Sequence, residues 1–236
     1  MAAAGWGAQD MNRWRWVKRG LLRSGLPPCR RLDFLNALLA YGQWIRRHPP
    51  PRHFPERQDL YRHVAEQLGG RPFDFLEAGV YRGESLRCWT QLSDCPETRF
   101  FGFDTFTGLP EAWHTGLKSF PAGQFDVGGV VPDIPDPRVR FYKGRFQQTV
   151  PEFLRAYRPQ PQLVVHCDAD LYSSTLYFLT RLHDVLAAGT YLLFDNFSVA
   201  LHDFRAFCDY TGAYGRDYEV VATAEIDFEK IALRLK

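Results

Sequence analysis

Apolar and polar residues follow one another along this chain in blocks that predict strands and helices in turn. Short apolar runs recur between segments whose apolar residues return every three or four positions, the period of a helix. The expected strands are 73–78, 99–106, 139–146, 163–167, 190–194, 218–223 and 230–235. The expected helices are 31–47, 55–68, 84–92, 150–157, 173–186 and 201–210. Strands that alternate with helices form a parallel sheet covered by helices on both faces.

The last two expected strands break this alternation. The connection between them, residues 224–229, is too short for a crossover helix, so these strands are expected to pair antiparallel. The fold class is therefore α/β: a seven-stranded, mostly parallel sheet with helices on both faces and an antiparallel last strand. In such sheets, ligands bind beyond the carboxyl ends of the strands.

Length and charge divide the chain into two parts. With 236 residues, 45% of them apolar, it can form one α/β domain at 55–236 after a helical extension at 1–54. Residues 1–54 hold ten Lys and Arg against two Asp and Glu, a net charge of +8, and the remainder carries −6. Trp6, Trp14 and Trp16 lie among these basic residues. We expect this arm to pack on the acidic body or on a second copy, forming a homo-oligomer. Nucleic acid is not an expected partner, because the body contains no recognisable module for it.

Hydropathy and cysteine usage indicate where the protein is found. No apolar run approaches 18 residues, so no membrane span is expected. The five cysteines are odd in number and contain no Cys-x-x-Cys pair, which suggests neither a zinc site nor a disulfide framework. The reducing cytoplasm is the simplest location.

The most informative segment is 74–85, which contains Glu77, Gly79 and Gly83. It has the pattern of a strand, a tight turn and a helix N-terminus, and the turn lacks side chains where a ligand would approach. We expect this turn to receive the charged amino-acid end of a cofactor.

Acidic residues follow three further strands of the expected sheet. Asp104 follows the second strand, Asp168 and Asp170 follow the fourth, and Asp195 and Asn196 follow the fifth. A single Asp in such a place is commonly a helix cap, but successive acids at one edge of a sheet indicate a shared site. Asp104 is expected to accept hydrogen bonds from ribose hydroxyls.

Two of these acids are candidates for a metal site. Asp168 and Asp195 end neighbouring strands, about 4.8 Å apart, and their charges repel unless a proton or a cation lies between them. Mg2+ fits such oxygen ligands, and the Asn196 carbonyl offers a third. The alternative is that each acid binds separately to nearby loops.

The segment 111–137 is long and rich in Gly, Pro and aromatic residues, including Trp113, Phe120 and Phe125. Such a connection is usually functional or disordered, and we expect an aromatic lid over the site, the alternative being a surface excursion. His114 within it is a candidate acid–base residue.

Five motifs in the order of the chain resemble the macrocin O-methyltransferase family, whose members methylate sugar hydroxyls of macrolide antibiotics. They are the segment 77–85, Asp-Thr-Phe-Thr-Gly-Leu-Pro at 104–110, Lys-Gly-Arg-Phe at 143–146, Asp-Ala-Asp-Leu-Tyr-Ser-Ser-Thr at 168–175 and Asp-Asn-Phe at 195–197. The resemblance covers about residue 60 to the C-terminus, and 168–175 is its most specific part. It implies the Rossmann-like class I methyltransferase fold, S-adenosylmethionine (SAM) as donor and often Mg2+.

The resemblance also implies roles for individual residues. It implies that Asp168, Asp195 and Asn196 are metal ligands. Asp168, which could hold the ion or take the proton, is the expected catalytic residue, and His114 of the segment 111–137 is a second candidate from its own position in the sequence. Asn196 stands where the macrolide enzymes usually have a second acid, but catechol-type methyltransferases carry Asp-Asn there. The expected cofactor-binding residues are Glu77, Gly79, Tyr81, Arg82, Gly83, Ser85, Asp104, Thr105, Phe106, Gly144, Phe146 and Asp168.

The expected function is therefore a SAM-dependent O-methyltransferase that acts on a hydroxyl of a small molecule, of sugar or natural-product type, with help from Mg2+. Three alternatives stay open from the sequence. They are an aminopropyl transferase on a related sheet, a non-catalytic binding module that works through the basic arm, and a metal-independent methyltransferase with another base such as His114.

Overall fold

The structure is a computed structural model that describes residues 8–27 and 29–236, with side chains of the first helix described from Trp14 onward. Trp6 of the expected arm lies outside the described residues. One eight-stranded sheet has the order β1-β9-β10-β8-β7-β2-β3-β6. Its strands are β1 His53–Phe54, β2 Asp74–Ala78, β3 Arg99–Asp104, β6 Val139–Lys143, β7 Leu163–Cys167, β8 Tyr191–Phe194, β9 Tyr218–Ala224 and β10 Lys230–Leu235.

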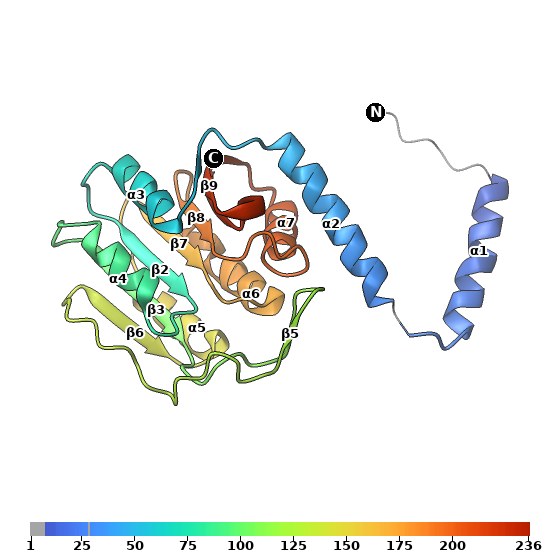
Figure 1. The fold of residues 1–236 in the computed structure, drawn as a ribbon, viewed down its shortest axis with the longest axis horizontal. Helices are drawn as coiled ribbons and strands as arrows, with labels where there is room; N and C mark the ends of the chain where they lie inside the picture. Colours follow the sequence, from blue (N-terminus) through green and yellow to red (C-terminus); the bar gives the residue numbers. More distant parts are fainter. Residues whose placement is uncertain (1–7, 28) are drawn as a thin grey trace.

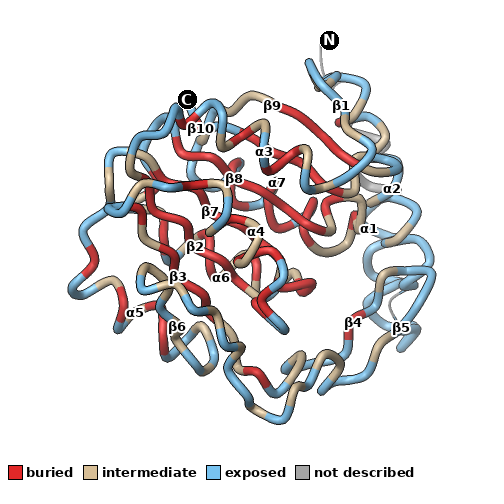
Figure 2. Tube along the Cα trace, turned by 60° about the vertical axis from the view of Figure 1, so that its left-hand side comes forward, coloured by how far each residue is buried: buried red, intermediate tan, exposed pale blue. Residues whose placement is uncertain are grey.

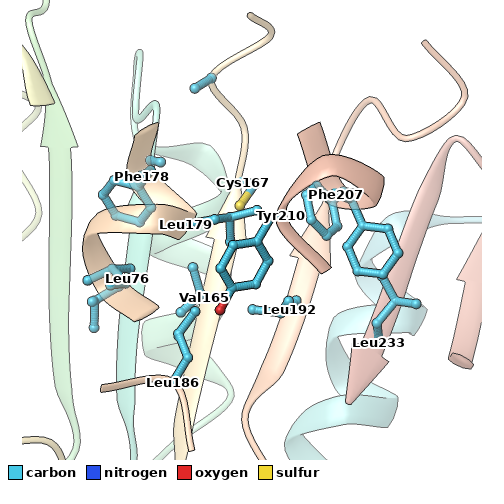
Figure 3. Close-up of a cluster of buried hydrophobic side chains, with 14 of the residues drawn as sticks. Leu76, Val165, Cys167, Phe178, Leu179, Leu186, Leu192, Phe207, Tyr210 and Leu233 are labelled. Atoms are coloured by element: carbon cyan, nitrogen blue, oxygen red, sulfur yellow. The ribbon is translucent and has the colours of Figure 1, made fainter. Parts of the chain in front are cut away.

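Helices cover both faces of the sheet (Figure 1). The described helices are α1 Ala8–Arg23, α2 Arg30–Arg47, α3 Arg57–Leu68, α4 Glu84–Gln91, α5 Phe146–Ala156, α6 Tyr172–Leu182 and α7 Asp203–Tyr214, with short 3-10 turns at His183–Val185 and Ile226–Phe228. One buried cluster joins the strands to α2, α5, α6 and α7, and Figure 3 shows its centre, with Val165 and Leu192 facing Leu179 and Tyr210. A second cluster joins the opposite face to α3 and α4.

The seven expected strands are all present, and β10 pairs antiparallel with both β8 and β9 as expected. The structure adds an edge strand, β1, which pairs parallel with β9 and lies before the expected domain start at residue 55. Two expected strands, β3 and β6, end earlier than predicted. β3 ends at Asp104 because Phe106 has a positive φ of 59°, which an extended strand cannot contain. β6 ends at Lys143 because α5 already begins at Phe146.

The two N-terminal helices differ in how they contact the body. Tyr41 and Trp44 of α2 are buried against α7 and the segment before it, and the Trp44 indole donates to the Tyr218 hydroxyl at 2.8 Å. α1 lies apart from the sheet and its helices (Figure 1), and its residues 14–23 are all exposed (Figure 2). No helix among residues 8–27 and 29–236 is long and apolar enough to cross a membrane.

Trp44 holds α2 to the body, since its ring meets Phe197 at 5.2 Å and Phe204 at 5.9 Å between centroids. We expect Trp44→Ala to lower the free energy of unfolding by about 3 kcal/mol, because it leaves a cavity and an unpaired Tyr218 hydroxyl. Trp16→Ala is the matched control: Trp16 is 80% exposed, so its loss should change stability by less than about 0.5 kcal/mol. Denaturant unfolding of both variants measures the difference, and equal losses would contradict this account of α2.

Candidate functional site

A cavity of about 650 Å³ opens at the carboxyl ends of the parallel strands. Eight of the residues expected in the site line it: Gly79, Tyr81, Asp104, Thr105, Phe146, Asp168, Asp195 and Asn196. Seven others expected there do not line it: Glu77, Arg82, Gly83, Ser85, Phe106, His114 and Gly144. The cavity wall also includes residues that the sequence did not single out, among them Arg57, Glu111, Arg145, Asp170 and Ser173.

The turn after β2, residues 79–83, contains two glycines, and contacts within the protein account for them. Gly79 has a φ of +88°, and a Cβ there would lie 1.9 Å from the carbonyl oxygen of Asp168 at the end of β7. Gly83 has a φ of +76° and is the residue before α4. The sequence attributed the missing side chains to an approaching ligand. At Gly79 the approaching group is the chain's own backbone, although the residue also lines the cavity.

Asp104 clamps this turn to the end of β3. Its Oδ2 accepts hydrogen bonds from the backbone N–H groups of Val80 at 2.7 Å and Tyr81 at 2.8 Å. Its Oδ1 accepts from the backbone N–H of Phe106 at 2.7 Å. The expected ribose contact stays a prediction, and Oδ1 is the oxygen with more room for a further donor. Replacing Asp104 would therefore disturb the turn as well as any ribose contact.

Glu77 and Ser85 lie behind the cavity wall in a buried polar chain. Glu77 Oε1 accepts from the Ser85 hydroxyl and lies 2.9 Å from His166 Nδ1, while His166 Nε2 lies 3.2 Å from the Tyr61 hydroxyl. Because a carboxylate only accepts, Nδ1 donates and Nε2 of a neutral ring accepts from Tyr61. Glu77 Oε2 is buried without a hydrogen-bond partner, and Glu77, His166 and Asp168 offer ligand atoms within 4.8 Å of one another. Glu77 is fully buried and is not among the residues that line the cavity.

Three carboxylates meet at the carboxyl ends of β7 and β8. Burial raises the pKa of Asp168 well above its usual range, and the charges of Asp195, Asp170 and Glu77 raise it further. Burial also raises the pKa of Asp170 to about 8, together with the charges of Asp203 and Asp195. The Asn196 amide nitrogen donates to Asp170 Oδ1 at 2.9 Å. Asn196 therefore uses its nitrogen on a neighbouring acid and keeps its carbonyl oxygen as an acceptor.

Two cations that the sequence did not reveal flank Asp195. Lys230 Nζ lies 3.0 Å from Asp195 Oδ2, and Arg57 Nη1 lies 3.7 Å from Asp195 Oδ1. The distance to Arg57 is that of an ion pair and is too long for a hydrogen bond, so Oδ1 is buried without a hydrogen-bond partner. The Asp195 Oδ1 atom, the half-buried carboxylate of Asp168 and the carbonyl of Asn196 form a donor set that suits a hard divalent cation.

The lid segment packs over the cavity through its aromatic side chains. Trp113 stacks on Phe120 at 4.9 Å between centroids, in a hairpin of β4 Trp113–His114 and β5 Ser119–Phe120, and Phe125 meets Tyr81 at 5.6 Å. His114 is exposed and outside the cavity lining, with its Nδ1 2.8 Å from the Ser119 hydroxyl. The structure therefore gives no support to His114 as an acid–base residue.

His202 lies beside the lid and is held on both ring nitrogens. Its Nδ1 accepts from the backbone N–H of Tyr172 at 3.0 Å, so its Nε2 carries the proton and donates to the His114 carbonyl at 3.0 Å. Burial lowers the pKa of His202. This histidine fastens the lid hairpin to the start of α6.

The strand order and the cavity define the class I fold of SAM-dependent methyltransferases. The methyltransferase domain family matches residues 76–197, and the chain belongs to this family. The O-methyltransferase NovP superposes with a TM-score of 0.58 at 24% identity over 75% of this chain and 78% of that one. The calicheamicin methyltransferase CalS11 gives 0.56 at 19% identity over 99% and 98%.

Two curated relatives are O-methyltransferases. One is the 8-demethyl-8-(2,3-dimethoxy-alpha-L-rhamnosyl)-tetracenomycin-C 4'-O-methyltransferase of Streptomyces olivaceus, 30% identical over 62% of this chain and 60% of that protein. The other is the demethyldecarbamoylnovobiocin O-methyltransferase of Streptomyces niveus, 27% identical over 65% and 67%. This chain therefore matches about 60% of the length of the first relative.

The approach of Gly79 to Asp168 can be tested by adding one methyl group. We expect Gly79→Ala to lower the free energy of unfolding by about 3 kcal/mol, because the positive φ and the collision with the Asp168 carbonyl add together. Gly189→Ala is the matched control, since Gly189 has a similar φ of +90° but nothing within 4 Å of its Cβ position. It should cost about 1 kcal/mol. Equal losses in denaturant unfolding would show that the close approach at Gly79 has no energetic weight.

Proposed function

We propose that this protein is a SAM-dependent O-methyltransferase that acts on a hydroxyl of a sugar or of another small natural product. The observation that carries the proposal is the meeting of Asp104, Asp168 and Asp195 around one cavity of about 650 Å³. These acids come from the ends of β3, β7 and β8, far apart in the sequence. The two curated relatives support this class of acceptor, since both are named as O-methyltransferases of natural products.

The chain's own residues divide the cavity into two parts. The turn 79–83, Asp104 and Thr105 form the part proposed for the cofactor, where Asp104 Oδ1 would accept from a ribose hydroxyl. When bound, SAM supplies a methyl group already activated on a sulfonium. Ser173, Glu111 and Trp113, from α6 and the lid, line the remaining part, where an acceptor would lie within reach of Asp168.

We further propose that Asp168, Asp195 and the carbonyl oxygen of Asn196 hold Mg2+ at this edge. The Asp195 Oδ1 atom, which has no hydrogen-bond partner, and the raised pKa of the Asp168 carboxyl, which burial and neighbouring acids cause, support this donor set. A divalent ion bound there would lower the pKa of an acceptor hydroxyl and orient it. Asp168 is the residue placed to hold the ion or to accept the hydroxyl proton.

The alternatives from the sequence have less support. A metal-independent enzyme with His114 as base would need this side chain in the cavity, and it lies outside. A non-catalytic module would have no need for three carboxylates at a common edge, one of them buried and two half-buried, since removing a charge from water costs stability unless it is compensated. A cytoplasmic location stays our proposal, consistent with five free thiols.

The variant Asp168→Asn distinguishes metal binding from cofactor binding, because it removes a charge at nearly constant volume. We expect SAM affinity to stay within about threefold, because Asp104 and the turn 79–83 are unchanged. Affinity for Mn2+, which accepts the same oxygen ligands as Mg2+, should fall at least about tenfold. Isothermal calorimetry with SAM and with Mn2+ measures both.

Asp209→Asn is the control for this experiment, since Asp209 is half exposed on α7 and pairs with Arg205. It should change neither affinity. An unchanged Mn2+ affinity in Asp168→Asn would refute the metal site, and absence of SAM binding by the folded wild-type protein would refute the methyltransferase proposal itself.

We also propose that two copies associate through the N-terminal helices. Leu32, Leu35 and Leu39 of α2 recur at helical spacing and are each more than half exposed, as are Leu21 and Leu22 of α1. Apolar surface of this kind on a monomer marks an interaction site. The arm is basic and the body acidic, so a second copy offers complementary charge as well as the same apolar surface.

A charge placed in this stripe tests the association. Leu35→Glu should convert a dimer into a monomer in sedimentation equilibrium, because it buries a carboxylate in an apolar interface. Gln91→Glu, at an exposed position on the body, should leave the dimer unchanged. A monomeric wild-type protein would refute the proposal, and a wild-type monomer that binds anionic vesicles would assign the arm to a membrane surface instead.

A further inference from the structure

Lys230 is a charged side chain in a buried position. It begins β10, next to the carboxyl ends of the parallel strands and in contact with Asp195. Only 7% of its surface is exposed, and it does not line the cavity. We propose that Lys230 is a built-in counter-charge that orients Asp195 and limits how tightly the strand-end acids hold a divalent cation. This inference rests on the proposed metal site and assigns a positioning role to a residue that touches neither cofactor nor acceptor.

The topology explains why a lysine from the end of the chain lies at this edge. The parallel strands all point their carboxyl ends toward one edge of the sheet, and the residues that follow β2, β3, β6, β7 and β8 line the cavity there. β10 runs antiparallel, so it brings its first residue there. In its register with β8, Ile231 lies opposite Phe194, which places Lys230 opposite Asp195. The antiparallel last strand therefore places a cation at the edge where Asp104, Asp168 and Asp195 lie at the carboxyl ends of parallel strands.

The contacts of the ammonium show that it is directed at Asp195. Lys230 Nζ donates to the Asp195 backbone carbonyl at 2.6 Å and to Asp195 Oδ2 at 3.0 Å. Glu229 Oε1 lies 3.1 Å away and Glu225 Oε2 3.7 Å away. A buried ammonium without such partners would be costly. Two bonds to a single residue, one to the backbone and one to the side chain, also restrict the rotation of the Asp195 carboxylate.

The two carboxylate oxygens of Asp195 have different surroundings. Oδ2 is used by Lys230, and Oδ1 keeps no hydrogen-bond partner and belongs to a residue that lines the cavity. Oδ1 makes only the longer ion pair with Arg57 at 3.7 Å, so it is the oxygen with room for a divalent cation. The same ammonium repels that cation, because two positive groups on opposite oxygens of one carboxylate lie only about 6 Å apart.

The two effects of Lys230 predict opposite changes in affinity when its charge is removed. Loss of orientation alone would weaken a cation at Asp195. Loss of repulsion strengthens it, and at about 6 Å the repulsion between unit and double charges amounts to about tenfold in affinity even when screened as in bulk water. We expect the electrostatic effect to be the larger one, since the site is buried and screening there is weaker.

The test compares Lys230→Gln and Lys230→Met with the wild-type protein, using Mn2+ titration by isothermal calorimetry without SAM. Lys230→Gln keeps a hydrogen-bond donor and removes the charge, so it serves if Lys230→Met does not fold. We expect both to bind Mn2+ at least about tenfold more tightly than wild type. Lys230→Arg keeps the charge and should stay within about threefold of wild type.

Lys236→Met is the matched control, because Lys236 is an exposed lysine just after the same strand and pairs with Glu219. Its Mn2+ affinity should equal that of wild type. A role of Lys230 in folding alone would destabilise the protein without tightening the site. Equal or weaker Mn2+ binding by folded Lys230→Gln would overturn this inference. No Mn2+ binding by wild type or any variant would instead overturn the metal site on which it rests.

Discussion

The ends of β2 and β7 approach so closely at Gly79 and Asp168 that no side chain fits between them. The cavity depends on this contact, because it sets the position of the turn 79–83 relative to Asp168. Asp104 adds a third strand end to the same arrangement, since it binds the backbone N–H groups of Val80 and Tyr81. Three adjacent strand ends are thus joined through the backbone of the turn 79–83, by the close approach of Asp168 and by the Asp104 carboxylate, and a rigid platform for ligands results.

Carboxylates gathered at one edge of the sheet repel one another, which makes their charged forms less favourable. Asp168, Asp170 and Asp195 are close together and largely removed from water, which raises the pKa values of Asp168 and Asp170. The fold partly compensates this charge with Lys230, Arg57 and the amide nitrogen of Asn196. Buried charges persist in proteins when such partners are present. The antiparallel hairpin of β9 and β10 therefore contributes to the site as well as to the sheet.

The N-terminal arm is connected to the site through the lid. A Cβ on Gly116, at the tip of the lid hairpin, would lie 2.2 Å from the Phe34 ring of α2, so the hairpin rests directly on this helix. α2 is in turn held by Trp44 against the aromatic residues Phe197, Phe204 and Phe207. The exposed leucines of α2 therefore lie on the same helix that the lid hairpin contacts.

The sequence by itself determined the alternation of strands and helices, the antiparallel last strand and the acids at the strand ends. These follow from local patterns: apolar periodicity, a connection too short for a helix, and motifs of a few residues. It could not determine that the Asp168 carbonyl leaves no room for a side chain at Gly79, that His114 lies outside the cavity, or that β1 extends the sheet. Nor did it reveal Lys230, Arg57 or the chain from Tyr61 through His166 to Glu77. Each depends on strand order and register, which bring together residues up to 173 positions apart, such as Arg57 and Lys230 around Asp195. Such pairings are decided by packing over the whole sheet, and no local pattern encodes them.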